Sequence, residues 1–218
     1  MQVHRPRIKM CGLTREEDVS AAVMAGADVV GFVLYPPSPR AVSAHRAGVL
    51  ARLLPPFVTP VLLFVNASPQ EIREGLAAVP NALLQFHGDE TPAQCREHGR
   101  PYMRAVRIGP SQGDSAMTDL LKYADSYPDA SALLLDALVQ GYGGGGHAFD
   151  WTAFDWSHPK LNASARLVLS GGLTPANVTD GIRLVRPWAV DVSSGIEQQK
   201  GIKCADKMRA FAQAVYQA

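Results

Sequence analysis

The sequence predicts an α/β fold in which parallel strands and helices alternate along the whole chain. Eight short apolar runs recur through the 218 residues, each followed by a polar cap and a longer segment with apolar residues at helical spacing. The runs are almost continuously apolar, as expected for parallel strands that helices cover. No G-x-G-x-x-G motif follows an early strand, which disfavours the alternative of an open doubly wound sheet. We therefore predict a single-domain (β/α)8 TIM barrel over residues 1–218.

The predicted strands repeat at intervals of about 27 residues, which is toward the compact end for a closed barrel of eight units. We assign them to residues 7–11, 29–35, 59–66, 82–87, 102–108, 132–137, 166–170 and 189–193.

Capping sequences mark the starts of several predicted helices. Residues 14–17, Thr-Arg-Glu-Glu, have the spacing of a capping box, and the helix that follows is expected to end near Gly26. Ser68, Thr91 and Thr174 each precede a proline, which combines a capping hydroxyl with a residue suited to the first helical position. These sites predict three further junctions between a strand and its helix.

Composition and charge restrict the class of function. The hydrophobic fraction is 47%, the charged fraction is 19% and the formal net charge is +1. No broad electrostatic field therefore favours nucleic acid or an anionic membrane as a partner. No apolar run approaches the ~20 residues of a membrane span, and the N-terminus lacks the features of a signal peptide. We expect a cytoplasmic protein, and a monomer and a homodimer both remain open.

The three cysteines are Cys11, Cys95 and Cys204, which are far apart and lack CxxC or Cys/His ligand spacing. We expect reduced thiols, with neither a disulfide framework nor a metal site.

Polar residues at the C-terminal ends of the strands are the catalytic candidates, because barrels of this type work at that face. Cys11 closes the first strand, and alternation puts Lys9 on the same face, where an ammonium could lower the thiol pKa. The alternative for a lone cysteine is a buried core residue. Asp136 ends the sixth strand as a candidate general acid or as a cap for a neighbouring loop. Asp191 faces inward from the eighth strand, either as a second acid or orienting group or as a structural residue.

Two glycine-bearing segments predict a phosphate site. Gly171 and Gly172 follow the seventh strand, and Ser193, Ser194 and Gly195 lie at the end of the eighth strand and just after it. The loops after these two strands frequently bind phosphate through backbone N–H groups in (β/α)8 barrels.

Three further polar residues are candidates for positioning a substrate. Arg40 lies on a proline-stiffened loop after the second strand, where its planar fork could hold a carboxylate or could simply be solvated. Gln85 and His87 share one face of the fourth strand, and His87 is either a ligand-positioning group or a hydrogen-bonded residue of the barrel rim.

Seven motifs occur in a defined order along nearly the whole chain. They are Lys9-Met10-Cys11-Gly12-Leu13-Thr14, Gly31-Phe32 through Ser38-Pro39-Arg40, Gln85-Phe86-His87-Gly88-Asp89-Glu90, Leu135-Asp136, Gly143 through Phe149-Asp150-Trp151, Ser170-Gly171-Gly172-Leu173 and Asp191-Val192-Ser193-Ser194-Gly195-Ile196-Glu197. In combination, order and spacing they resemble the phosphoribosylanthranilate isomerase family of tryptophan biosynthesis.

The resemblance implies a cofactor-free Amadori rearrangement of a small phosphorylated substrate, from N-(5-phosphoribosyl)anthranilate to 1-(2-carboxyphenylamino)-1-deoxyribulose 5-phosphate. In the family's scheme, the aspartate that matches Asp136 protonates the ribose ring oxygen and opens the ring to a Schiff base. The cysteine that matches Cys11 removes the acidified C2 proton, and the enolamine tautomerises to the aminoketose. The same likeness puts Arg40 at the anthranilate carboxylate, and around the phosphate it puts Gly171, Gly172, Ser193 and Ser194.

The sequence departs from the family's pattern at two places. A glycine-threonine-glycine element reads Gly144-Gly145-Gly146 here, which keeps Gly144 and Gly146 as positioning candidates but removes a threonine hydroxyl near the phosphate. The family's Lys-Asp before the last helix reads Lys203-Cys204, which removes a favoured N-cap side chain.

Two alternatives remain open from the residues themselves. One is another sugar-phosphate barrel, such as a pentose-phosphate epimerase or an amino-sugar isomerase, because phosphate loops alone do not identify the sugar. The other is a non-catalytic barrel that binds a phosphorylated ligand, in which Cys11 packs in the core and Asp136 caps a loop.

Overall fold

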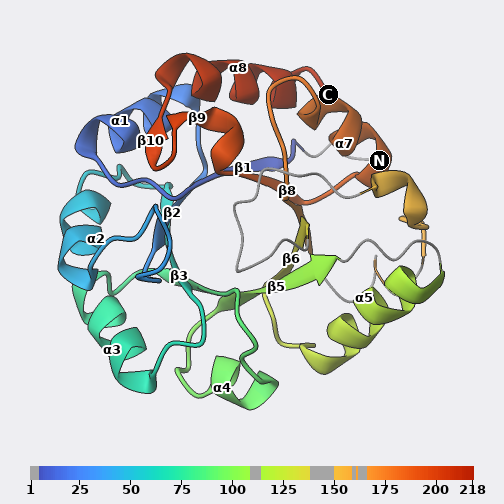
Figure 1. Cartoon of the computed structure of the whole chain (residues 1–218), viewed down its shortest axis with the longest axis horizontal. Helices are drawn as coiled ribbons and strands as arrows, with labels where there is room; N and C mark the ends of the chain where they lie inside the picture. The colour runs from blue at the N-terminus through green and yellow to red at the C-terminus, as the bar shows by residue number, and fades with distance from the viewer. Residues whose placement is uncertain (1–4, 109–113, 138–149, 159–160, 162–165) are drawn as a thin grey trace.

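Eight parallel strands close into a barrel in the computed structural model, each paired with the next in sequence and β8 paired with β1 (Figure 1). The structure describes residues 5–108, 114–137, 150–158, 161 and 166–218. The strands are β1 (Arg7–Cys11), β2 (Val29–Val33), β3 (Thr59–Phe64), β4 (Leu83–Phe86), β5 (Tyr102–Ile108), β6 (Ala132–Ala137), β7 (Leu167–Leu169) and β8 (Ala189–Val192). All eight predicted strands are confirmed, with ends that differ by at most two residues.

Helices form the outer ring around the barrel (Figure 1). They are α1 (Glu16–Ala25), α2 (Ala44–Ala51), α3 (Pro69–Ala78), α4 (Pro92–Arg96), α5 (Asp114–Ser126), α7 (Val178–Val185) and α8 (Ala205–Tyr216), with single 3-10 turns at η1 (Trp151–Ala153) and η2 (Ser194–Ile196). The predicted (β/α)8 barrel with parallel strands is confirmed. None of the described helices is both long enough and apolar enough to cross a membrane.

The helix starts are only partly as predicted. Ser68 and Thr91 cap α3 and α4 ahead of a proline, as expected, and each also completes a capping box, which was not predicted. The predicted capping box at residues 14–17 is wrong, because α1 begins one residue later with Arg15 as its N-cap, and the Thr14 hydroxyl instead donates a hydrogen bond to the Gly201 carbonyl. The prediction at Thr174 is also wrong, since Thr174 opens a turn whose backbone bonds to Asn177, the N-cap of α7.

Strand alternation separates two layers of core. A cluster drawn only from strand residues, among them Leu134 and Val168, fills the barrel interior. Ile8 and Met10 instead pack in the larger cluster that includes helical residues such as Val19. The alternation predicted for β1 is therefore confirmed, and it turns Lys9 and Cys11 toward the barrel interior and its mouth.

A short antiparallel hairpin follows β8 and η2, and it was not predicted. It consists of β9 (Glu197–Gln199) and β10 (Ile202–Lys203). Figure 1 shows it between α1 and α8, on the side of the barrel where β1 lies. The hydrogen bond from Thr14 to Gly201 ties the hairpin turn to the loop after β1.

Candidate active site

Cys11 lies at the C-terminal end of β1, beside a buried ion pair between β1 and β8. Lys9 is paired in register with Asp191, and the Lys9 Nζ donates to Asp191 Oδ1 at 2.8 Å. The other carboxylate oxygen of Asp191 accepts a hydrogen bond from the Ser170 hydroxyl at 3.1 Å. Both oxygens of Asp191 are thus engaged, and the carboxylate holds the Lys9 ammonium next to the thiol.

Opposing effects of burial and of neighbouring charges set the pKa of the Cys11 thiol. Burial disfavours the thiolate and raises the pKa of Cys11, while Lys9 lowers it and the charge of Asp191 raises it. The net pKa lies above the ordinary value, so the expected lowering by Lys9 is present but burial outweighs it. For Lys9 itself, burial opposes the charge, but Asp191 and Cys11 together outweigh burial and raise the pKa of the ammonium.

Asp136 ends β6 and belongs to a buried chain of three polar side chains. The Gln85 Nε2 lies 3.1 Å from the His87 Nδ1, and the His87 Nε2 lies 3.1 Å from the Asp136 Oδ2. Because an amide nitrogen can only donate, Nδ1 accepts and the Nε2–H of His87 donates to the carboxylate. Gly171 also approaches Asp136 closely, since a Cβ there would lie 3.0 Å from Oδ1 and 2.6 Å from the backbone of Ala137.

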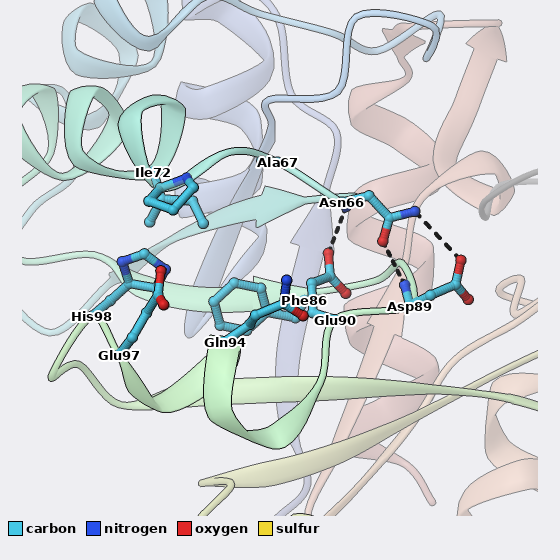
Figure 2. A pocket seen from close by; sticks show the side chains of 10 residues that line it. Asn66, Ala67, Ile72, Phe86, Asp89, Glu90, Gln94, Glu97 and His98 are labelled. Atoms are coloured by element: carbon cyan, nitrogen blue, oxygen red, sulfur yellow. Dashed lines mark hydrogen bonds and ion pairs between the residues drawn. The ribbon is translucent and has the colours of Figure 1, made fainter.

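The loop after β4, which follows His87, is anchored on both sides. Gly88 N donates to Glu90. Glu90 also accepts from Asn66 N at 2.7 Å, as Figure 2 shows. Asp89 N donates to the Asn66 side chain at 2.7 Å. Asn66, Asp89 and Glu90 border a pocket of about 340 Å³ between the loops leading to α3 and α4. The lining of this pocket includes no residue of the predicted site.

Arg40 is buried, although its position on a loop suggested an exposed side chain. Its side chain is 8% exposed, and it donates from Nε and Nη2 to the two carboxylate oxygens of Glu197 at 2.6 and 2.8 Å. Glu197 also accepts from the Lys203 Nζ at 2.9 Å. The simply solvated alternative for Arg40 is therefore wrong, since the guanidinium has a fixed partner on the hairpin.

The two loops predicted to hold phosphate meet at the barrel mouth. Gly171 and Gly172 have left-handed backbone, and a Cβ on Gly195 would lie 1.9 Å from the carbonyl oxygen of Leu173, so the loops after β7 and β8 are in contact. Ser193 donates its hydroxyl to the Cys11 carbonyl at 3.0 Å. Ser194 begins the 3-10 turn η2. The candidates Gly144 and Gly146, with Gly145 between them, lie outside the described residues.

Sequence reasoning missed three charged residues at this face. Glu197 and Lys203 lie in segments that resemble the family's pattern, but the sequence alone predicts a role for neither. Arg107 lies on β5, where it is paired in register with Asp136 of the neighbouring strand β6. Its side chain forms an ion pair with Asp89. The rule that singled out polar residues near strand ends applies equally to Arg107 and would have found it.

Around the rim, the predicted residues follow the order of the strands. Arg40 comes after β2, Cys11 ends β1, the glycine and serine loops follow β8 and β7, and Asp136 lies on β6. The loops predicted to hold phosphate thus lie between the candidate base and the candidate acid.

Comparisons with known proteins agree on one family. The model of the family described as N-(5'phosphoribosyl)anthranilate (PRA) isomerase matches residues 8–214. The N-(5'-phosphoribosyl)anthranilate isomerase of Methylibium petroleiphilum is 60% identical over 214 residues, which are 98% of this chain and 95% of that protein.

Solved structures give the same result. The phosphoribosyl anthranilate isomerase of Thermotoga maritima is similar with a TM-score of 0.84 and 38% identity, covering 98% of this chain and 100% of that one. A phosphoribosyl anthranilate isomerase in complex with reduced 1-(o-carboxyphenylamino)-1-deoxyribulose 5-phosphate is similar with a TM-score of 0.80 and 36% identity, again covering 98% and 100% of the two chains.

Proposed function

The chain belongs to the N-(5'-phosphoribosyl)anthranilate isomerase family and is an isomerase of tryptophan biosynthesis, and we propose that Cys11 and Asp136 perform the two proton transfers of its reaction. The observation that carries this proposal is the order of groups around the barrel mouth, with the candidate acid and base on either side of the glycine and serine loops. Family membership removes the two alternatives, another sugar-phosphate barrel and a non-catalytic barrel. We further propose that residues 1–218 form one catalytic domain, and a cytoplasmic location stays a prediction.

The reaction begins at Asp136. Its carboxyl group donates a proton to the ribose ring oxygen, the bond between that oxygen and C1 breaks, and the nitrogen lone pair forms the Schiff base. The positive charge on the nitrogen acidifies the C2 proton, which the Cys11 thiolate removes to leave an enolamine. The enolamine then takes a proton at C1 and loses one from the C2 hydroxyl, so the overall change is an isomerisation that needs no net proton.

His87 has a supporting part in this proposal. Its Nε2–H donates to one oxygen of Asp136, which orients the carboxyl group and leaves the other oxygen to face the ring oxygen. Gln85 donates to Nδ1 and so selects the tautomer that keeps the proton on Nε2. Both residues are positioning groups.

The substrate carries two anionic groups, and the site offers a place for each. Arg40 has two of its three nitrogens committed to Glu197, and the Nη1/Nη2 edge remains to bind the anthranilate carboxylate. The backbone N–H groups around Gly171, Gly172, Ser193 and Ser194 bind the phosphate. Lys9 keeps a positive charge beside Cys11, and Asp191 holds Lys9 in place.

The test is turnover of N-(5'-phosphoribosyl)anthranilate by the purified protein, followed as loss of anthranilate-type fluorescence with no metal added. Cys11→Ala and Asp136→Asn should each lower kcat by about a hundredfold or more, because each removes a proton-transfer group. Thermal melting establishes that both variants fold.

Matched substitutions away from the barrel mouth serve as controls. Cys95→Ala alters a buried cysteine of α4, and Asp119→Asn alters an exposed carboxylate of α5. Both should keep wild-type turnover. Normal turnover by a well-folded Cys11→Ala or Asp136→Asn protein would contradict the assigned role.

A further inference from the structure

The hairpin of β9 and β10 holds the guanidinium of Arg40 from one side. The two carboxylate oxygens of Glu197 accept hydrogen bonds from Nε and Nη2 of Arg40, at 2.6 and 2.8 Å. This is the bidentate geometry that a planar guanidinium and a planar carboxylate allow. Both side chains are buried, at 8% and 6% exposure. A bidentate pair in this environment restricts the guanidinium to one plane and one rotation about its Cδ–Nε axis.

Lys203 connects the same carboxylate to the loop after β8. Its side chain is fully buried and its Nζ has three acceptors, which are Glu197 Oε1 at 2.9 Å, the Ser193 carbonyl at 3.0 Å and the Ser193 hydroxyl at 3.2 Å. Ser193 in turn donates to the Cys11 carbonyl. A continuous chain of polar contacts therefore joins Arg40 to the loop predicted to hold phosphate and to the backbone of the candidate base.

Backbone contacts enclose Arg40 from the other directions. A Cβ on Gly12 would lie 2.6 Å from the Arg40 Cδ, so the aliphatic part of Arg40 lies directly on the residue after Cys11. Gly201, at the hairpin turn, has a φ of +80°, and a Cβ there would lie 2.7 Å from the carbonyl oxygen of Pro39. The hairpin thus packs against the residue next to Arg40 and against Thr14.

The charges of this cluster leave one face of Arg40 for an anion. Arg40 and Glu197 carry opposite charges, whereas burial lowers the pKa of Lys203 in spite of the neighbouring Glu197 carboxylate. Burial opposes ionisation of Glu197, but Arg40 and Lys203 outweigh it and lower its pKa, so the carboxylate stays charged. The positive guanidinium and its Nη1/Nη2 edge are what a substrate carboxylate requires.

We propose that Glu197 is a positioning residue that gives the enzyme its selectivity for a carboxylate-bearing substrate, because its two hydrogen bonds hold Arg40 with one guanidinium edge toward the barrel mouth. Lys203 donates to the buried carboxylate and ties it to the loop after β8. The inference rests on the proposed role of Arg40 in binding the anthranilate carboxylate, and it adds the residues that orient it.

The experiment compares two ligands that differ by one group. They are reduced 1-(o-carboxyphenylamino)-1-deoxyribulose 5-phosphate and the same compound without its carboxyl group, each titrated by calorimetry. The ratio of their affinities measures selectivity for the carboxylate and cancels any general damage to the phosphate site. Glu197→Gln should lower this ratio by about tenfold, the cost of one weakened charged hydrogen bond, with little change for the ligand that lacks the carboxyl group.

Arg40→Ala separates this inference from the proposal beneath it. In Arg40→Ala the two ligands should bind with nearly equal affinity, so that the ratio falls to about one. The double variant Arg40→Ala and Glu197→Gln should have the same ratio, because Glu197 acts only through Arg40. If Arg40→Ala leaves the ratio intact, the carboxylate-binding role of Arg40 is wrong. A second outcome is that Arg40→Ala removes the selectivity but Glu197→Gln keeps the wild-type ratio, either with both affinities unchanged or with both lowered equally. In that case only the positioning role of Glu197 is wrong.

Two further variants guard against loss of folding. Glu17→Gln makes the same change in an exposed pair with Arg15 and should leave the ratio at the wild-type value. If Glu197→Gln does not fold, the double variant Glu197→Gln and Lys203→Met removes both buried charges together and makes the same test. Its ratio is expected to fall as in Glu197→Gln, and an unchanged ratio would overturn the inference.

Discussion

At the scale of single residues, the reactivity of Cys11 depends on whether burial or the neighbouring ammonium prevails. A thiol with an ordinary pKa of about 8.5 is only a few per cent thiolate at neutral pH. Burial raises the pKa of Cys11 above the ordinary value in spite of Lys9, so the thiolate is still scarcer in the free enzyme. The positive charge of the Schiff base then favours the thiolate, at the step in which the base is needed.

The pH dependence of kcat/KM tests this balance. Because burial gives Cys11 a raised pKa and the base must be deprotonated, kcat/KM should rise with pH from neutrality into the alkaline range. Lys9→Met removes the charge that lowers the thiol pKa, so the rise should move to higher pH. The measurement is kcat/KM between about pH 6 and pH 10, a range that spans the ordinary thiol pKa of about 8.5.

The double variant Lys9→Met and Asp191→Asn is the control for this shift. It removes both charges of the buried pair, and the charge of Asp191 raises the pKa of Cys11. The rise in kcat/KM should therefore return toward the wild-type pH. If kcat/KM of Lys9→Met rises at the same pH as in the wild type, Lys9 does not lower the pKa of Cys11.

At the scale of elements, the eight strands could be predicted and the hairpin could not. The strands are apolar runs that alternate with helices along the chain, and such runs can be recognised from the local sequence alone. The hairpin reads Glu-Gln-Gln-Lys-Gly-Ile-Lys over residues 197–203, which has too few apolar residues to indicate a strand. Its importance comes from a contact with Arg40, 157 residues away in the chain, and no local pattern reveals it.

Helix caps show the same limit. Ser68 and Thr91 cap their helices as predicted, because each is followed by a proline and also by Glu71 or Gln94 at the third helical position, whose side chain bonds back to the cap. Thr174 also precedes a proline but lacks such a glutamate or glutamine, and α7 begins after Asn177 instead. Thr14 had the right spacing, but its hydroxyl bonds to Gly201 instead. A tertiary partner therefore displaced a local one, which a sequence pattern cannot anticipate.

The start of α8 offers a prediction at this scale. Cys204 is the N-cap of α8, with extended backbone and no hydrogen bond from its side chain to the first turn. Cys204→Asp should stabilise the protein by about 1 kcal/mol, because an aspartate oxygen accepts from an otherwise unpaired N–H at the helix start. Urea unfolding measures the gain. Cys204→Ala is the control with no capping group, and a Cys204→Asp protein no more stable than it would contradict the prediction.

At the scale of the whole molecule, the two ends of the barrel have different tasks. The C-terminal ends of the strands carry Cys11, Asp136 and Arg40, whereas Asp28 precedes β2 at the opposite end. Asp28 accepts from Ile8 N at 2.8 Å and from Arg5 at 2.7 and 2.9 Å, which ties the start of β1 to that of β2. Residues at this end are expected to affect stability and not turnover.

Asp28→Asn tests that division of labour. Burial opposes the charge of Asp28, but Arg5 and Ile8 N outweigh it and lower its pKa below the unfolded value of about 3.9. A carboxylate with a lowered folded pKa adds stability above the unfolded pKa, and this contribution disappears as pH falls through the folded pKa.

At pH 7 the Asp28→Asn variant should lose about 1–3 kcal/mol of unfolding free energy, measured by urea titration, which is the usual contribution of a charged hydrogen bond. The difference from wild type should shrink as the pH is lowered through about 4, while kcat at pH 7 stays within about twofold. A difference in stability that does not change with pH would show that the charge of Asp28 is not what stabilises the fold. A large fall in kcat would show that Asp28 affects turnover as well as stability.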